Sequence, residues 1–322
     1  MIEVLSSTRF LEVISNLYGK RDVDVKRILS RYKKLLVDFF NCFSSNSVQL
    51  FSTPGRTEIG GNHTDHNHGR VLAASVNLDS IAAVSAVTDN SIAVFSEGYK
   101  DPFLVSLDEL EKKKEEEENT SALIRGIAAR LNQLGYKIGG FNAYISSEVL
   151  PGSGLSSSAA FEILIATIFN VLFNQGRISP QELAFIGLYA ENVYFNKPCG
   201  LMDQLACSIG GFISIDFEDP EKPVVEKINF DFEQENYNLI VLNTGSTHTD
   251  LTGDYKSIPE EMKKVATILG GEVCREISYK ELIANIGKIR LSSGDRSVLR
   301  AYHFIQENLR VEHQVQALKK KD

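Results

Sequence analysis

The sequence predicts an α+β protein with two domains, and three observations support this fold class. Residues 1–45, 259–270 and about 296–319 carry apolar side chains at helical spacing. Between these helical regions lie segments with the alternation and the β-branched residues that are typical of strands. The chain has 322 residues, which is long enough for two domains of ordinary size and a sizeable core.

The first half of the chain begins with helix and continues with strands. Strands are expected at residues 48–52, 71–87, 92–95 and 141–145. Pro54-Gly55 is expected to close the first of these strands with a turn. An amphipathic helix is expected over residues 123–134, and Gly135 ends it. The charge block at residues 108–118 is expected to be a solvated helix or loop without a role in a site.

A joint rich in glycine and serine, residues 150–160 (LPGSGLSSSAA), follows the strand at 141–145. The run from Phe161 to Phe173 is almost continuously apolar and lacks Pro and Gly, which predicts a buried helix. At such a helix start the backbone N–H groups lack partners and the helix dipole adds partial positive charge, so the joint is predicted to bind phosphate. The alternative is an ordinary turn capped by serine. A Walker-type loop is excluded by its missing Gly-Lys-Ser/Thr, and the dinucleotide pattern fails at Ser157.

The second half of the chain returns to helical patterns. A helix is expected at residues 180–195, with Pro180 near its start. Residues 197–217 are expected to hold a Gly-Gly turn and an alternating strand, and a further strand is expected at 239–242. A domain boundary is expected near residues 218–236, where polar and acidic residues cluster.

Composition bears on partners and location. The net charge of −8 argues against general binding to nucleic acid, and no basic amphipathic stripe points to a membrane surface. The four cysteines, Cys42, Cys199, Cys207 and Cys274, are scattered without a Cys-x-x-Cys pair, which fits a reducing cytosol. The N-terminus lacks the basic region and apolar core of a signal peptide, so a cytoplasmic location is expected.

A dense polar run, residues 55–69 (GRTEIGGNHTDHNHG), is expected to form a functional loop between two strands. One interpretation is a zinc-type centre, although the spacing fits no helical zinc motif. Its potential ligands are His63, Asp65, His66 and His68. The other interpretation is a polyol site, because Asn62, His63 and Asp65 supply mixed donors and acceptors for sugar hydroxyls. Arg56 could meet phosphate with its planar guanidinium fork.

Two carboxylates form a second group of candidates. Glu191 lies on the predicted helix, and Asp203 follows the Cys199-Gly200 turn. Such a pair can divide labour, with one carboxylate on a metal ion and the other near a reacting hydroxyl. The alternative is that Glu191 is a surface residue and Asp203 a turn cap. Residues 245–255 give a weaker signal for the edge of an active site.

Together these stretches resemble the GHMP kinase superfamily and, within it, the galactokinases. Residues 151–159 are similar to the superfamily's serine-rich phosphate loop. Residues 55–67 are similar to the galactokinase sugar motif Gly-Arg-x-Asn-x-Ile-Gly-Glu-His-Thr-Asp-Tyr-Asn. Residues 199–204 match the Cys-Gly-x-Met-Asp-Gln element, and the family places a Glu at the distance that separates Glu191 from Asp203.

Two later segments extend the resemblance, which runs from about residue 50 to the end of the sequence. His248 and Tyr255, seven residues apart, match the family's later sugar-site segment. Residues 300–311 resemble its Arg-His…Glu-Asn-x-Arg-Val helix.

The resemblance implies a role for each matched residue. Asp203 lies at the anomeric hydroxyl of the sugar as general base or orienting charge, and Arg56 stabilises charge on the transferred phosphoryl group. The ATP phosphates are bound by Gly152, Ser153, Gly154, Leu155, Ser156, Ser157 and Ser158. Ser158 and Glu191 hold Mg²⁺. The sugar is bound by Asn62, His63, Thr64, Asp65, Gly200 and Tyr255. This division agrees with phosphoryl transfer, which needs positioning and charge neutralisation more than covalent catalysis.

The implied activity is that of an ATP- and Mg²⁺-dependent sugar kinase that makes galactose 1-phosphate in the Leloir pathway. The implied fold has a helical extension at 1–45, a ribosomal-protein-S5-like domain at 46–218 and a ferredoxin-like domain at 219–322. The family's glycine-rich C-terminal segment does not occur in the sequence up to Asp322, so the last domain is expected to be incomplete. The sequence does not indicate an oligomeric state.

Two departures of the sugar motif from the family pattern matter for the substrate. Asn62 stands where the family has Glu, and His66 where it has Tyr. The first change removes a charge-assisted hydrogen bond worth about 1.5–3 kcal/mol. Two alternatives therefore stay open: a GHMP kinase for another sugar or small alcohol, and a catalytically impaired sugar-binding or regulatory relative.

Overall fold

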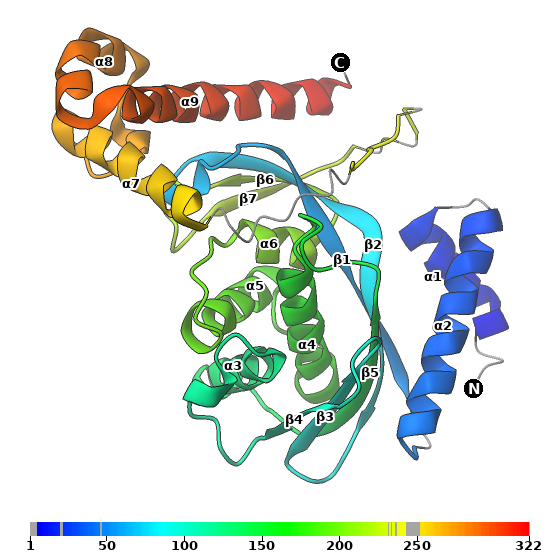
Figure 1. Cartoon of the computed structure of the whole chain (residues 1–322). Helices are drawn as coiled ribbons and strands as arrows, with labels where there is room; N and C mark the ends of the chain where they lie inside the picture. The colour runs from blue at the N-terminus through cyan, green and yellow to red at the C-terminus, as the bar shows by residue number, and fades with distance from the viewer. Residues whose placement is uncertain are drawn as a thin grey trace. The chain divides into compact units, whose positions relative to one another are not determined.

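The computed structural model describes residues 5–19, 22–45, 47–230, 232, 234–235, 237–242 and 252–321, without the side chains of 22, 23 and 252–256. The chain forms two compact units (Figure 1). The first comprises Met1–Gly55 and Val76–Ile209, and the second comprises Arg56–Ser75 and Gly210–Asp322. Each unit contains two separate stretches of the sequence, because two long strands, β1 (Gln49–Gly60) and β2 (Arg70–Ala86), each continue from one unit into the other. The domain bounds expected from the sequence stay a prediction.

A mixed sheet forms the frame of the first unit. Its strand order is β4-β3-β5-β2, and β1 pairs with β2. The other strands are β3 (Ser91–Ser96), β4 (Phe103–Ser106) and β5 (Phe141–Ser147). β3 and β5 run parallel, whereas β2 and β5 run antiparallel with Ala82 opposite Ile145. This register turns the apolar set of β5 toward the main core, as the alternation in the sequence predicts.

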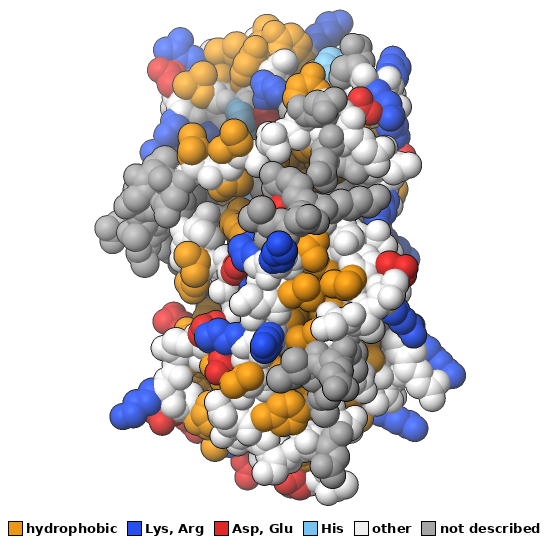
Figure 2. All heavy atoms as spheres, turned by 90° about the vertical axis from the view of Figure 1, so that its right-hand side faces the viewer, with side chains coloured by type: hydrophobic (Ala, Val, Ile, Leu, Met, Phe, Trp, Pro, Cys, Tyr) orange, Lys and Arg blue, Asp and Glu red, His pale blue; other side chains and the backbone are white. Residues whose placement is uncertain are grey.

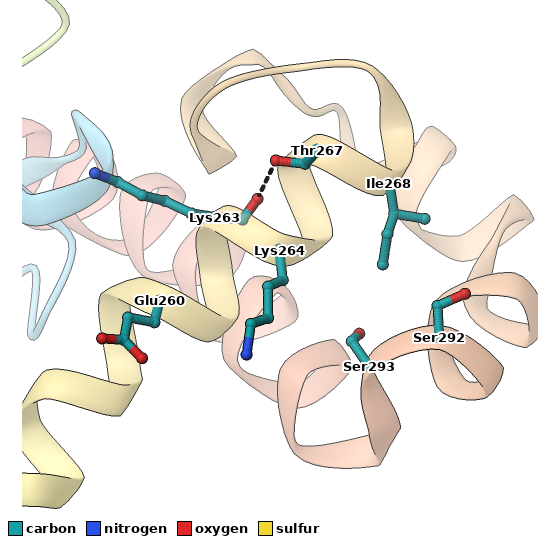
Figure 3. Close-up of a pocket in the computed structure, with 7 residues that line it drawn as sticks. All are labelled: Glu260, Lys263, Lys264, Thr267, Ile268, Ser292 and Ser293. Carbon is teal, nitrogen blue, oxygen red and sulfur yellow. Dashed lines mark hydrogen bonds between the residues drawn. The ribbon is translucent and has the colours of Figure 1, made fainter.

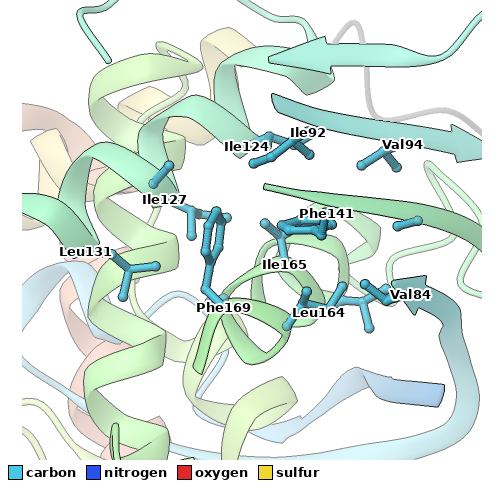
Figure 4. Close-up of a cluster of buried hydrophobic side chains, with 14 of the residues drawn as sticks. Val84, Ile92, Val94, Ile124, Ile127, Leu131, Phe141, Leu164, Ile165 and Phe169 are labelled. Carbon is cyan, nitrogen blue, oxygen red and sulfur yellow. The ribbon is translucent and has the colours of Figure 1, made fainter. Parts of the chain in front are cut away.

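Helices cover both faces of this sheet (Figure 1). On one face lie α3 (Thr120–Gln133), α4 (Ser157–Asn174) and α5 (Pro180–Tyr189). Apolar side chains from these helices and the strands point toward one another in the main core (Figure 4). Phe141 of β5 and Phe169 of α4 meet edge to face there, with ring centroids 5.3 Å apart. Burial of each such side chain contributes about 1.5–3 kcal/mol.

The N-terminal helices cover the other face of the sheet. They are α1 (Thr8–Tyr18) and α2 (Asp22–Cys42). Ile28, Leu35 and Phe39 of α2 are buried in one cluster with Ile81 and Ala83 of β2. The helical pattern predicted over residues 1–45 is confirmed for Thr8–Tyr18 and Asp22–Cys42, and its apolar stripe is the face that packs on the sheet.

The second unit combines a smaller sheet with long helices. β6 (Phe212–Asp216) pairs antiparallel with both the first part of β2 and β7 (Val224–Ile228). The helices are α7 (Thr252–Leu269), α8 (Tyr279–Ala284) and α9 (Ile286–Lys320). α9 leaves helical geometry once, at Gly294, where φ is 83°. One cluster packs α7 against α9, and another packs Val311 and Val315 of α9 over the sheet.

Two sequence-based expectations are wrong, and one helix was not predicted. Pro54-Gly55 makes no turn, because β1 continues through it to Gly60. A proline is tolerated at a strand edge, where no partner needs its missing N–H. Residues 202–209 form a helix, α6 (Met202–Ile209), which the sequence reading missed. Residues 239–242 form no strand and are exposed, since strand propensity without a partner strand is not enough.

Two features bear on the predicted partners. Among the described helices, α4 alone is apolar and long enough to cross a membrane, and 56% of that stretch is buried. It forms part of the main core, as central helices of globular proteins do. On the face in Figure 2, basic and acidic side chains are interspersed rather than gathered by sign.

Candidate active site

The phosphate loop, residues 150–156, joins the strand region of β5 to the start of α4. Gly152 and Gly154 have φ of 73° and 76°, which glycine adopts readily. A Cβ atom placed on either residue would meet nothing within 4 Å. Ser153 folds back on the loop, and its hydroxyl donates to the carbonyl of Leu150 at 2.6 Å. The loop therefore has open space beside its two glycines, as the binding of a phosphate group there would require.

Ser156 occupies the N-cap position of α4 but does not cap the helix with its side chain. It has left-handed backbone geometry, with φ of 57°, and its side chain makes no capping hydrogen bond to α4. Its hydroxyl donates to Asp203 on the first turn of α6 instead. The amides of the first turn of α4 are thus left without a capping side chain, which favours the anion-binding interpretation over the capped turn.

Leu155 anchors the phosphate loop. Its side chain is buried with Val149 and Ile163, so only its backbone is placed to meet a ligand. A Cβ atom on Gly55 of β1 would lie 2.9 Å from the carbonyl oxygen of Leu155. Glycine at this position lets the strand approach the loop closely. Arg56 is the next residue along β1 and is partly buried.

Glu191 is the centre of a buried hydrogen-bond network. It lies in a π-helical turn, residues 190–194, that continues α5, and its side chain is 2% exposed. π-helical turns inside helices are frequent at functional sites. The carboxylate accepts four hydrogen bonds: from Ser158 Oγ at 3.0 Å, Lys197 Nζ at 2.8 Å, Cys199 Sγ at 2.9 Å and Gln204 Nε2 at 2.9 Å.

Glu162 forms the inner end of this network. It lies on α4, is fully buried, and accepts a hydrogen bond from Gln204 Nε2 at 3.0 Å. Burial, and then the charge of Glu191, raise the pKa of Glu162 well above its usual value. The raised pKa favours the neutral form of Glu162, which shares the amide group of Gln204 with Glu191.

Lys197 and Cys199 were not singled out for this network by sequence reasoning. Burial, and then the charge of Glu191, raise the pKa of Cys199, so it stays a thiol that donates to the carboxylate. Burial lowers the pKa of Lys197, but the Glu191 charge outweighs that effect and the net pKa is raised. The sequence does contain an indication of this role, because Lys197 and Cys199 lie in the segment between the two predicted carboxylates, Glu191 and Asp203.

The oxygens of Ser158 and Glu191 fit a magnesium ion. Mg²⁺ prefers oxygen ligands and is usually held by one or two carboxylates together with substrate phosphates. Ser158 Oγ and Glu191 Oε1 lie 3.0 Å apart at the start of the helix that follows the phosphate loop. The zinc interpretation of the polar run finds no support, because the described residues contain no group of three metal-binding His, Cys, Asp or Glu side chains.

The sugar-motif loop, residues 60–69, lies in the second unit and is held by α9. The amide of Gly61 donates to Glu307 Oε1 at 3.0 Å, and the amide of Arg70 donates to Asn308 Oδ1 at 2.7 Å. His303 Nε2 lies 2.8 Å from the carbonyl oxygen of Asn62. The tail pattern at 300–311 was noticed in the sequence, but its role in holding this loop was not.

The predicted sugar ligands differ in their surroundings. Asn62 is exposed, and its amide donates to Glu58 Oε2 at 3.1 Å. Burial lowers the pKa of His63, and Asp65 accepts the amide of His66 at 3.0 Å. Thr64 is fully buried, with its hydroxyl 2.8 Å from the carbonyl of Gly61 and 2.7 Å from that of Arg70. Its hydroxyl therefore supports the loop, whereas the other three side chains are partly or fully accessible.

The structure brings together only part of the predicted site. Ser156 meets Asp203, and Ser158 meets Glu191, all within the first unit. Gly200 is part of the same unit and precedes α6. Tyr255 lies in α7, but its side chain is outside the described residues, as is His248.

A pocket of about 540 Å³ in the second unit is separate from these residues. It lies between α7 and α9 (Figure 3). Its lining residues are Glu260, Lys263, Lys264, Thr267, Ile268, Ser292 and Ser293. None of the residues predicted for catalysis or binding is among them.

Sequence comparisons identify similar proteins. The profile described as GHMP kinases N terminal domain matches residues 122–211, and the galactokinase galactose-binding signature matches residues 38–86. The chain is 30% identical over 288 residues to the galactokinase of Streptomyces coelicolor, covering 88% of this chain and 72% of that protein. It is 31% identical over 296 residues to the galactokinase of Clostridium perfringens, covering 87% and 72% respectively.

Solved structures show a similar fold. Lactococcus lactis galactokinase complexed with galactose superposes with a TM-score of 0.72 at 26% identity, covering 90% of this chain and 74% of that one. Methanococcus jannaschii mevalonate kinase superposes with a TM-score of 0.52 at 16% identity, covering 85% and 81%. The second likeness concerns the fold alone.

Proposed function

The chain belongs to the galactokinase family of GHMP kinases, and from this premise we propose that it transfers the γ-phosphate of ATP to the anomeric hydroxyl of galactose. The predicted GHMP kinase fold is confirmed by the structural likenesses. One observation carries the proposal for this chain. Two serines of one helix start, Ser156 and Ser158, hydrogen-bond to the two carboxylates Asp203 and Glu191.

The phosphate loop binds the nucleotide in this proposal. The exposed backbone of Gly152 to Gly154 and the first-turn amides of α4 meet the phosphates, because that helix end attracts anions. Ser156 and Ser157 line the same helix start. Mg²⁺, when bound by Ser158 and Glu191, supplies positive charge that neutralises the phosphates.

Asp203 and Arg56 complete the phosphoryl transfer. Asp203 accepts the proton of the attacking hydroxyl or orients it, since the carboxylate already accepts a hydroxyl hydrogen bond from Ser156. Arg56 stabilises charge on the transferred group through its guanidinium fork. Galactose is bound by Asn62, His63, Thr64, Asp65, Gly200 and Tyr255. Among these, Thr64 acts by shaping the loop, because its hydroxyl is buried.

The departure at Asn62 has a local compensation. The galactokinase motif carries Asn and Glu at the positions of Glu58 and Asn62, so the two residue types are exchanged in this chain. The exchanged side chains hydrogen-bond to each other at 3.1 Å. A carboxylate is thus retained beside position 62, and this favours galactose over a sugar that needs no acceptor there.

Another sugar or small alcohol is the second candidate substrate class. The exchange at Glu58 and Asn62 moves the carboxylate, and a moved acceptor can select a different hydroxyl pattern. We place the reaction in the cytoplasm, since the four cysteines are scattered in the sequence without a Cys-x-x-Cys pair, which fits a reducing compartment.

The test is ATP-dependent phosphorylation of galactose by the purified protein, compared with other hexoses and small alcohols. Asp203→Asn should lower turnover by about 10²–10⁴-fold if the carboxylate is the general base. Asp101→Asn is the matched control, because Asp101 is an exposed acid of the same unit. Turnover unaffected by Asp203→Asn would sink the assigned mechanism. Preference for another sugar would replace galactose without changing the reaction class.

A further inference from the structure

The carboxylate of Glu191 has two different sides. Oε2 accepts from Cys199 Sγ and from Gln204 Nε2, whose side chain is fully buried. Oε1 accepts from Ser158 Oγ at 3.0 Å and from Lys197 Nζ at 2.8 Å. The Lys197 side chain is 56% exposed, whereas that of Glu191 is 2% exposed. Oε1 is therefore the oxygen that a cation from solvent can reach.

The turn at residues 195–199 positions Lys197 beside Oε1 of Glu191. Asn196 has left-handed geometry with φ of 69°, and the amide of Lys197 donates to the carbonyl of Glu191 at 3.1 Å. The side chain of Asn192 accepts from the amide of Cys199 at 2.8 Å and donates to its carbonyl at 3.3 Å. Because both ends of the turn are hydrogen-bonded to the helix that carries Glu191, the turn holds the Lys197 ammonium group close to the Glu191 carboxylate.

The ammonium group neutralises a charge that is costly to bury alone. An ionised carboxylate removed from water needs a partner charge or a metal ion. In the described part of the chain, the ion pair to Glu191 comes from Lys197. The same oxygen and the same serine are the candidate ligands of Mg²⁺, and two cations that share one oxygen repel each other.

We propose that Lys197 is an exchangeable counter-ion of the metal carboxylate. Its ammonium group neutralises Glu191 while the metal is absent, and it moves away from Oε1 when Mg²⁺ arrives with the nucleotide. The inference rests on the proposed function, because it takes Glu191 as the metal-binding carboxylate. The consequence is that Lys197 weakens the dependence of nucleotide binding on Mg²⁺. If Lys197 is removed, the unneutralised Glu191 carboxylate repels nucleotide that carries no metal and attracts Mg²⁺ more strongly.

The test is calorimetric binding of AMP-PNP, a non-hydrolysable ATP analogue, measured in EDTA and again in Mg²⁺. The quantity compared is the metal ratio, defined as the Kd in EDTA divided by the Kd in Mg²⁺. Lys197→Met should raise the metal ratio about tenfold or more, the scale of a coupling near 1.4 kcal/mol. Lys197→Arg keeps the charge and should leave the ratio within about threefold of the unmodified protein.

Two further variants keep the experiment decisive. Lys100→Met is the matched control, because Lys100 is an exposed lysine of the same unit and its loss changes the net charge equally. Lys197→Gln keeps an N–H donor for Glu191 but no charge, so it should raise the metal ratio even if Lys197→Met does not fold. Thermal melting in EDTA checks folding: Lys197→Met should melt lower than Lys100→Met and regain stability with Mg²⁺ and AMP-PNP.

The outcomes separate this inference from the proposed function. A metal ratio that is unchanged in both Lys197→Met and Lys197→Gln overturns the counter-ion role and leaves the kinase proposal standing. A ratio that rises equally in Lys100→Met overturns it as well, because the effect is then one of net charge. Failure of the unmodified protein to bind AMP-PNP in either condition overturns both proposals.

Discussion

The phosphate loop and the sugar-motif loop both depend on glycine, for opposite physical reasons. In the phosphate loop, added Cβ atoms on Gly152 and Gly154 would meet open space. In the sugar-motif loop, a Cβ atom on Gly61 would lie 2.4 Å from the carbonyl oxygen of Arg70, and one on Gly69 would lie 2.4 Å from Thr64 Cβ. Glycine leaves open space beside the first loop, where we propose that the nucleotide binds, and permits close packing in the second. Substitutions should therefore separate ligand affinity from stability.

The largest effect on stability is expected from Gly61→Ala. The new methyl group would clash with backbone, and φ of 97° is unfavourable for alanine, so the free energy of unfolding should fall by about 3 kcal/mol. Urea unfolding measures this change. Gly98→Ala is the control, since φ there is 89° but the space is open, and it should cost about 1 kcal/mol. Equal losses in the two variants would contradict the packing argument.

The next effect is expected from Asn308→Ala. This change removes the acceptor that lies 2.7 Å from the amide of Arg70, and leaving this partly buried N–H unpaired should cost about 1–3 kcal/mol. Galactose affinity should fall with stability, because the amide closes the sugar-motif loop. Asn308→Asp keeps an acceptor oxygen and should lose less in both measurements. An Asn308→Ala protein as stable as the unmodified one would show that α9 does not hold the loop.

Gly152→Ala should lower ligand affinity more than stability, unlike the substitutions in the sugar-motif loop. The cost to stability should be about 1 kcal/mol, from the positive φ alone. The affinity for ATP should fall more, about tenfold, because the methyl group occupies the space where the proposal puts phosphate. Equilibrium binding of ATP and urea unfolding give the two values. The comparison between the loops fails if Gly152→Ala loses stability but binds ATP normally.

The smallest effect is expected from Asp216→Asn, at about 1 kcal/mol at pH 7. Asp216 accepts from Arg70 at 2.8 Å and from Arg275 at 2.8 Å, beside the end of the sugar-motif loop. Burial raises the pKa of Asp216, but the Arg275 hydrogen bond and the two arginine charges outweigh it, so the net pKa is lowered. Its stabilisation is therefore present above the unfolded pKa of about 3.9 and is lost as pH falls through the folded value.

Stability measured against pH checks this sign. The difference between Asp216→Asn and the unmodified protein should be constant from about pH 5 to 7 and should shrink below about pH 4. A difference that grows on acidification would mean that the charged pairs do not stabilise the loop.

Much of the first unit could be predicted from periodicity. The alternation at Phe141, Ala143 and Ile145 and the apolar run after Phe161 identified β5 and α4, because each buries a face that repeats with its own period. The prediction failed where local signals were ambiguous. Pro54 reads as a turn but lies in β1, and residues 239–242 read as a strand but lack a partner strand in the described structure.

Some contacts of the candidate site could be predicted from the sequence, and others could not. The motif residues Ser158 and Glu191 were named from the sequence, and the structure brings their side chains within 3.0 Å. The contact of Lys197 with Glu191 depends on the left-handed backbone geometry of Asn196, which no periodic pattern predicts. The contacts of Glu307 and Asn308 with the sugar-motif loop join residues more than 230 positions apart.

Most of the elements and the family resemblance could be predicted from the sequence alone, because periodicity, glycine and motif spacing are local properties of the chain. Which side chains share a carboxylate is seen only in the folded chain. Whether two polar groups form a hydrogen bond depends on differences of a few tenths of an ångström in their separation, and no periodic pattern sets these even for residues as near in the chain as Glu191 and Lys197. For that reason the loop rich in glycine and serine could be recognised in the sequence, whereas the contact between Lys197 and Glu191 became visible only in the fold.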